Sequence, residues 1–239
     1  MSDKVATFNP FNKQLDYDKT LKEVKYSLNG SDDGELYLES ARGESITYDD
    51  QRLRNANYSA SQGFGLRAIN GEVIGYSHSS DISEKAIKDA GRTVKLLING
   101  PKKAAKGPEK RIKTLYSQND PMISIPFDQK VELLKEIDSY IRSLDRRVVQ
   151  ATITFGASIQ EVKILRVDGN LTTDIRPMAR LNINIIVEQN GRRESGSSGA
   201  GGRFDLANLI LNNAWEKHAK EALRIALVNL NSVPAPAGI

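Results

Sequence analysis

The feature that most constrains the fold is an alternation of apolar and polar residues in the second half of the chain. Within Met178–Glu188 an apolar residue recurs at every second position from Leu181 onward: Leu181, Ile183, Ile185 and Val187. A period of two places such side chains on one face of a β-strand. The turn sequence Asn190-Gly191 follows, and Asn-Gly readily adopts the positive φ angles of a tight hairpin. Because Val149–Phe155 alternates in the same way, this half of the chain predicts an antiparallel meander.

The first half of the chain combines shorter strand patterns with helices. Its clearest hairpin joins Gly65–Ile69 to Val73–Tyr76, and Asp81, followed three residues later by Glu84, predicts a helix cap. Strands that come in runs, rather than alternating one-to-one with helices, indicate an α+β fold of antiparallel strands, a meander and packed helices. We expect helices over about 17–28, 81–99, 128–144 and 206–230, and strands over 35–39, 44–48, 55–61, 65–69, 73–76, 149–155, 162–167, 171–175 and 178–188.

The composition argues against a self-contained metal or triad enzyme. The 239 residues include no cysteine and only two histidines, His78 and His218. Metal sites and nucleophile–base pairs draw on these residue types. We therefore expect neither catalytic nor metal-ligating residues in the chain, and we interpret both histidines as ordinary surface or half-buried residues. No run of eighteen apolar residues or signal-peptide core occurs, so we expect a cytoplasmic protein with no membrane partner.

The basic segment Pro101–Lys113 is the most linker-like stretch, and it marks a sub-boundary within a domain predicted to span residues 1–232. Its positive charge is compatible with nucleic acid, but it contains no aromatic side chain on which a base could stack. The net charge of the chain is only +4. We interpret the segment as a solvated loop and expect no nucleic-acid partner.

A glycine- and serine-rich segment, Arg192–Phe204, lies between the last predicted strand and the last predicted helix. Glycine lets the backbone approach a ligand closely and adopt positive φ. The segment lacks the Lys-[Ser/Thr] end of a phosphate-binding loop, and the parallel context of a dinucleotide fingerprint is absent. From spacing alone we expect a flexible loop over a cleft or a partner surface.

The chain ends in an extended connector, residues 233–239. Proline donates no backbone hydrogen bond and restricts the residue before it, so Val233-Pro-Ala-Pro-Ala-Gly238 disfavours both helix and sheet. We expect this connector to lead into a further part of the protein.

Several separated motifs resemble the N-terminal domain of the TldD/PmbA family. The resemblance extends in order over nearly the whole chain, and the long glycine-rich segment ending in Gly-Arg-Phe makes it closer to TldD than to PmbA. The motifs are Ser61–Glu72, Asp174–Pro177, Val187–Glu194, Gly199–Phe204, and Ala226–Leu230 with Pro234–Gly238.

The resemblance implies a cytoplasmic zinc metallopeptidase that works as a homodimer or as a heterodimer with a PmbA-type subunit. Members of the family, also described as modulators of DNA gyrase, take flexible peptides into an enclosed channel. Their zinc is bound by a His-Glu-x-x-x-His motif and a later cysteine. This sequence has no His-Glu pair and no cysteine, so the resemblance places zinc in a C-terminal catalytic domain outside this chain, which we expect to be inactive alone.

The resemblance also suggests a substrate site. We predict that Gly199, Gly201, Gly202 and Arg203 line the peptide channel, with Arg203 meeting a carboxylate or carbonyl of an extended peptide. The alternative is that the glycines only permit a tight turn and Arg203 caps a neighbour. Two rival functions remain open at this point. One is a stand-alone module that binds extended peptides or a partner subunit, and the other is a gyrase- or DNA-associated factor.

Overall fold

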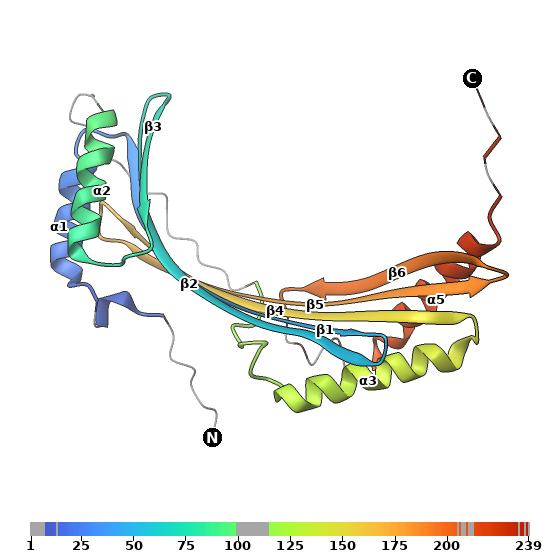
Figure 1. Cartoon of the computed structure of the whole chain (residues 1–239). Coiled ribbons are helices and arrows are strands. Elements are labelled where there is room, and N and C mark those ends of the chain that lie inside the picture. Colours follow the sequence, from blue (N-terminus) through green and yellow to red (C-terminus); the bar gives the residue numbers. More distant parts are fainter. Residues whose placement is uncertain are drawn as a thin grey trace. The chain divides into compact units, whose positions relative to one another are not determined.

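The computed structural model describes residues 8–12, 14–98, 115–204, 206, 209, 213–233, 235, 236 and 238 (Figure 1). Its strands form one six-stranded antiparallel sheet in the order β3-β2-β1-β4-β5-β6, which confirms the predicted α+β class. The predicted linker 101–113 lies outside the described residues, and the single domain 1–232 stays a prediction. The elements are η1 (Pro10–Asn12), α1 (Tyr17–Ser27), β1 (Asp33–Asp49), β2 (Arg52–Asn70), β3 (Val73–Ser79), α2 (Glu84–Leu97), α3 (Phe127–Leu144), β4 (Val148–Arg166), β5 (Leu171–Gln189), β6 (Arg192–Gly202) and α5 (Glu216–Leu230).

Four strands are about twice as long as the sequence predicts, because pairs of predicted strands fuse. The predicted segments 35–39 and 44–48 are both parts of β1, and β2, β4 and β5 each unite two segments in the same way. The middle of β1, Ser40–Ser45, contains no large apolar residue. The alternation of apolar and polar residues that predicts a strand is therefore absent there, although the backbone pairing continues. The chain divides into two compact units, and each of these four strands contributes residues to both of them.

Unit 1 comprises residues 1–42, 60–115 and 160–176. Here α1 and α2 lie side by side against the sheet (Figure 1). The predicted hairpin of β2 and β3 forms, with Ile69 opposite Ile74, but its turn residues are Gly71 and Glu72 because Asn70 still pairs with Val73. Its buried core joins one face of the strands to both helices: Leu15, Val24, Leu28, Leu36, Leu38, Phe64, Leu66, Ala68, Ile82, Ile87, Ala90, Val94, Ile98 and Leu165.

Unit 2 comprises residues 43–59, 116–159 and 177–239. Helices α3 and α5 lie on the same side of its strands (Figure 1). Within this unit, buried Lys130 of α3 binds Glu44 of β1 at 2.5 Å and the carbonyl of Met122 at 2.6 Å, so its ammonium group is paired. The core again uses one face of the strands: Ile46, Tyr48, Leu134, Ile137, Ile141, Ala151, Ile153, Phe155, Leu181, Ile183, Ile185, Val187, Trp215, Ala219, Ala222 and Ala226.

Two predicted helix starts are wrong. Helix α2 begins at Glu84 with Ser83 as its N-cap, and Ser83 Oγ accepts from Ala86 N at 3.2 Å, whereas Asp81 instead accepts from the Ser83 hydroxyl. Helix α5 begins at Glu216, not near residue 206, because Asn213 adopts a φ of 53°, which no α-helix accommodates. Within the described part of the chain, no helix is both long and apolar enough to span a membrane.

Candidate functional site

The glycine-rich segment predicted as a loop is mostly strand β6. It pairs with β5 in an antiparallel register that runs from Gln189 opposite Arg192 to Ala179 opposite Gly202. The Asn190-Gly191 turn is a tight hairpin in which both residues have positive φ, 54° and 80°. Glycine and serine are common in loops, but β6 is held as a strand by its neighbour and by a helix, so tertiary context overrides composition.

The alternation along β5 and β6 separates two faces. One face carries the buried residues of β5 and packs toward the helices, and the other face is open. The register places Gly199 opposite Asn182 and Gly201 opposite Arg180, all on the open face. Gly202 lies opposite buried Ala179 and therefore belongs to the other face. The structure thus brings two of the three predicted glycines together and places the third elsewhere.

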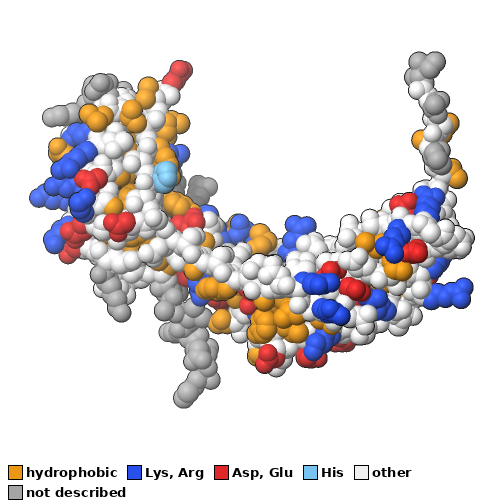
Figure 2. Space-filling model, in the orientation of Figure 1, with side chains coloured by type: hydrophobic (Ala, Val, Ile, Leu, Met, Phe, Trp, Pro, Cys, Tyr) orange, Lys and Arg blue, Asp and Glu red, His pale blue; other side chains and the backbone are white. Residues whose placement is uncertain are grey.

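The open face of β5 and β6 is hollowed by about 820 Å³. In Figure 2 the surface over these strands is mostly white, the colour of backbone and uncharged polar side chains. The Arg180 guanidinium donates to Asn182 Oδ1 at 3.0 Å and so fixes that amide in the hollow. The lining alternates short polar side chains with bare backbone and includes Met178, Arg180, Asn182, Asn184, Ser195, Ser197, Gly199 and Gly201.

Gly199 permits a close approach between β6 and β5 beside the hollow. A Cβ atom there would lie 2.5 Å from the carbonyl oxygen of Leu181 and 2.7 Å from Asn182 Oδ1. Real Cβ atoms do not come so close to backbone, so any other residue would push β6 away from β5. Glycine at this position therefore permits the close pairing of the two strands.

The covered face of β6 carries helix α5. A Cβ atom at Gly196 would lie 2.2 Å from the carbonyl oxygen of Ala222 and 2.4 Å from Ala226 N, so the helix backbone rests directly on the strand. Ser198 Oγ and His218 Nδ1 lie 3.0 Å apart and join the two elements. Burial lowers the pKa of His218, with a smaller contribution from the nearby positive charge of Lys217. A half-buried imidazole whose pKa is lowered suits a structural link between β6 and α5.

Arg203, the fourth predicted site residue, follows the end of β6. Its guanidinium carbon lies 5.2 Å from the centre of the Tyr116 ring, a cation–π contact. Arg203 does not line the hollow. The neighbouring Gly202 packs against the ring of Phe204, where a Cβ atom would lie 2.3 Å from a ring carbon. These contacts place Arg203 and Gly202 beside the site rather than in it.

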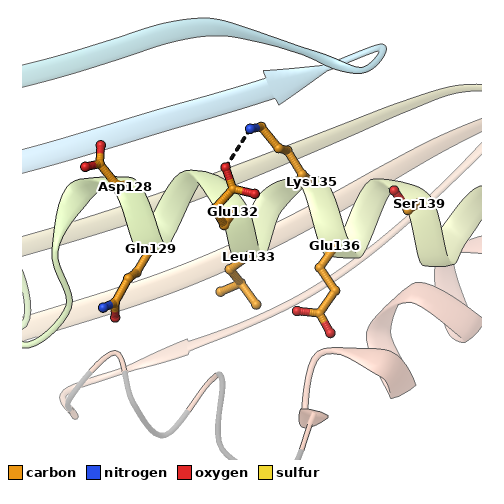
Figure 3. Close-up of a pocket in the computed structure, with 7 residues that line it drawn as sticks. All are labelled: Asp128, Gln129, Glu132, Leu133, Lys135, Glu136 and Ser139. Carbon is orange, nitrogen blue, oxygen red and sulfur yellow. Dashed lines mark hydrogen bonds and ion pairs between the residues drawn. The ribbon is translucent and has the colours of Figure 1, made fainter.

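A second hollow, of about 560 Å³, follows the outer surface of α3 (Figure 3). All of its lining residues come from that one helix, and Lys135 binds Glu132 at 2.6 Å. In Figure 3, Asp128 and Lys135 point to one side of the helix, and Gln129 and Glu136 to the other. The side chains that line this hollow do not converge on a common point. We therefore interpret this surface as the solvated face of an amphipathic helix.

Across the described ranges, no three His, Cys, Asp or Glu side chains converge as metal ligands. His78 belongs to unit 1, where its ring stacks on Tyr76, and His218 belongs to unit 2, where it bonds to Ser198. The residues described here therefore do not fit the zinc that the resemblance implies, and no chemical step can be assigned to them.

The sequence prediction missed most of the polar residues in the hollow, among them Asn182, Asn184, Ser195 and Ser197. Two signals could have found them. The apolar alternation of β5 predicts that Asn182 and Asn184 face away from the core, and the Asn190-Gly191 turn requires a partner strand directly after it. A strand there would have placed every second residue of the glycine-rich segment beside those amides.

Comparisons with known proteins identify the class of this chain. Residues 34–97 match the family domain described as PmbA/TldA metallopeptidase domain 1, and residues 120–230 match the PmbA/TldA metallopeptidase central domain. The chain thus matches two successive domain models of a metallopeptidase family. It belongs to the TldD/PmbA family, as its motifs predict.

Curated relatives agree with this assignment. The chain is 31% identical over 246 residues to the metalloprotease TldD homologue of Buchnera aphidicola subsp. Schizaphis graminum, covering 100% of this chain and 50% of that protein. It is 33% identical to the homologue of Haemophilus influenzae, covering 87% of this chain and 45% of that protein. The chain therefore spans about half the length of the curated relatives it matches.

Solved structures share the fold. A protein from Bacteroides thetaiotaomicron described as a modulator of DNA gyrase matches with a TM-score of 0.71 and 16% identity, over 92% of this chain and 52% of that one. TldE from Thermococcus kodakarensis matches with a TM-score of 0.69 and 16% identity, over 91% of this chain and 49% of that one.

Proposed function

We propose that this chain is the substrate-binding scaffold of a TldD-type zinc metallopeptidase that cleaves flexible or unfolded peptides. The two metallopeptidase domains it matches and the name metalloprotease TldD given to its relatives support the assignment. The zinc ligands and the catalytic base would come from residues beyond the 239 of this chain. Its own contribution would be to bind and align the peptide, without cleavage by the chain alone.

The observation that carries this proposal is the hollowed face and the edge of β6. Among the described residues, β6 is the last strand of the sheet, so its outer backbone groups face no further strand. An extended peptide can add to such an edge through main-chain hydrogen bonds, which are largely indifferent to sequence. Bare backbone at Gly199 and Gly201 would let the peptide approach closely, and Asn182 and Ser197 would offer it polar contacts.

Arg203 has a more peripheral role in this proposal. It is exposed at the end of β6, where its charge could meet a peptide carboxylate while its guanidinium stays stacked on Tyr116. A cytoplasmic location and a dimer with a second TldD- or PmbA-type subunit are proposals that rest on the resemblance alone.

Binding of a fluorescent, unstructured peptide of about ten residues to the chain tests this function. We expect Asn182→Ala with Ser197→Ala to weaken binding about tenfold, because two hydrogen bonds of about 0.5–1.5 kcal/mol each would be lost. Glu136→Ala, in the α3 hollow, is the matched control and should leave the affinity unchanged. Equal affinities of both variants and the parent chain would contradict the proposed site.

Cleavage separates the scaffold from the rival binding module. In a complete TldD-type protein, the same Asn182→Ala and Ser197→Ala pair should raise KM for an unfolded peptide and leave kcat nearly unchanged. A stand-alone module would bind peptide through β6 in this chain, while the pair would not affect proteolysis by any longer form of the protein. The open edge of β6 is compatible with both functions, and the metallopeptidase domain matches favour the scaffold.

A further inference from the structure

The hollow over β5 and β6 contains a positive charge without an acidic partner. Among the described residues, Arg180 is the only charged residue that lines it, so the lining contains no carboxylate. Arg180 is exposed, and within the described ranges no ion pair joins its guanidinium to an acidic group. On the same face of the hairpin, by contrast, Arg193 binds Glu188 at 2.5 Å. The hollow therefore presents one uncompensated cation to whatever enters it.

The side chain of Arg180 is held in place by its neighbours in the sheet. Its first two carbon atoms lie close to bare Gly201, where an added Cβ atom would be 3.2 Å from each of them. Its Nε atom donates to Asn182 Oδ1 at 3.0 Å. In the described part of the chain, this bond occupies only Nε and leaves the two terminal nitrogen atoms to donate to a ligand. The guanidinium is thus positioned but not satisfied.

The groups beside the guanidinium also donate hydrogen bonds. Because Asn182 accepts from Arg180 through Oδ1, its NH₂ group is left as a donor. Ser195 and Ser197 add hydroxyl groups to the same lining. An ionised carboxylate only accepts hydrogen bonds, and the planar fork of arginine can bind both of its oxygen atoms at once. The charge and the donors of the hollow therefore complement a carboxylate and disfavour a cationic ligand.

We propose that the hollow selects extended peptides that carry an acidic side chain, and that Arg180 binds its carboxylate. This inference rests on the peptide-binding role proposed above for the edge of β6. In a strand added to that edge, alternate side chains lie on the open face, where one of them can reach over Gly201 toward the guanidinium. A C-terminal carboxylate would instead continue along the axis of the added strand. We therefore assign the site to a glutamate or aspartate side chain and not to a chain end.

Four fluorescent peptides of about ten residues test this specificity with the 239-residue chain. Three are capped at both ends, share one uncharged sequence and differ only in a central Gln, Glu or Lys; the fourth keeps the Gln and has a free C-terminal carboxylate. We expect the Glu peptide to bind about fivefold more tightly than the Gln peptide, because it adds a charge-assisted hydrogen bond at an exposed site. The Lys peptide should bind more weakly than the Gln peptide, and the free carboxylate should give no gain.

Variants of Arg180 assign the preference to this residue. Arg180→Gln should bring the ratio of the Glu and Gln affinities to about one, and Arg180→Glu should make the Lys peptide the tightest ligand. Arg224→Gln is the matched control, because it removes one positive charge from the exposed surface of α5, where Arg224 binds Glu221. It should keep the fivefold ratio, which separates a local contact from attraction by the net charge of +4. Circular dichroism checks that each variant keeps its fold.

The outcomes separate this inference from the function on which it rests. Equal affinities of the parent chain for the Glu and Gln peptides would overturn the inference and leave the peptide site in place. The same holds for a fivefold ratio that persists in Arg180→Gln, or for tightest binding of the peptide with the free C-terminal carboxylate. If no peptide binds the parent chain, the proposed function and this inference are both wrong.

Discussion

Unit 2 contains two sheet edges of opposite character. Strand β6 is backed along one face by α5, whose backbone touches Gly196, and its open face is hollowed and polar. In the first half of β2, Arg52–Ser59, which we call the bare edge, every residue is exposed, and none of the described helices covers either face. An edge strand covered by a helix offers an incoming peptide contacts with the helix and with a polar surface, whereas an edge strand without a helix offers only backbone hydrogen bonds. The difference explains why we assign a flexible ligand to β6 and not to the bare edge.

The largest expected effect on this contrast between the two edges comes from adding a side chain at Gly196. Gly196→Val would drive a Cβ atom into the carbonyl of Ala222, so α5 must lift from β6. We expect the free energy of unfolding to fall by about 3 kcal/mol. Asn57→Val on the exposed bare edge is the control and should change stability by less than about 0.5 kcal/mol. Urea denaturation measures both values, and equal losses would show that the two edges do not differ in this way.

Replacing one arginine on each edge is expected to produce a smaller difference in stability. The Arg192 guanidinium donates to the carbonyl of Asn229 at 3.0 Å and to that of Ser232 at 2.8 Å, so it caps the C-terminal end of α5. Arg192→Ala should therefore lower the free energy of unfolding by about 1 kcal/mol. Arg54 makes only an exposed ion pair with Asp49 at 3.6 Å, so Arg54→Ala should have almost no effect on the monomer. Thermal unfolding in dilute solution compares them, and an equal effect of both would refute the capping role.

The smallest expected difference between the two edges is in how their stability responds to a fall in pH. Burial lowers the pKa of His218 below its ordinary value of 6.5, so the unfolded chain takes up this proton first. The stability of the α5–β6 contact is therefore full above pH 6.5 and declines as the pH falls below it. Amide exchange should show weaker protection of β6 at about pH 5 than at about pH 7.5. The bare edge has no group that titrates in this range.

The matched control for the acid effect is His218→Gln, which removes the titrating group and keeps a hydrogen-bonding side chain near Ser198. Its β6 protection factors should be the same at both pH values. A pH-dependent loss of protection that survives this substitution would assign the effect to another group.

The sequence was a good guide to the fold where local signals were strong. Helix α1 and the apolar alternation of residues 181–187 lie where residue patterns place them, and the turn between β2 and β3 lies one residue after the predicted one. The length of β1 could not be predicted, because Ser40–Ser45 lacks large apolar residues and pairing with β2 and β4 holds it. The start of α5 was missed because the positive φ of Asn213 leaves no composition signal.

The candidate site was predicted less well than the fold. Gly199 and Gly201 lie on one surface, but they belong to strand β6 and not to the predicted loop. The polar partners Asn182 and Asn184 became visible only with the register of β5 and β6, which local composition does not specify. Whether these residues bind peptide stays a prediction.

The strands common to both units have a further consequence for how accurately the chain must fold. In β1, buried Leu36 and Leu38 belong to one core and buried Ile46 to the other, and all three occupy even-numbered positions of the same strand. A register shift of one residue in such a strand would expose the apolar side chains of both cores at once. The free-energy cost of the shift would therefore be roughly twice that for a strand that serves one core. Because each long strand contributes to both cores, the burial of apolar side chains in either unit fixes the register of the whole strand.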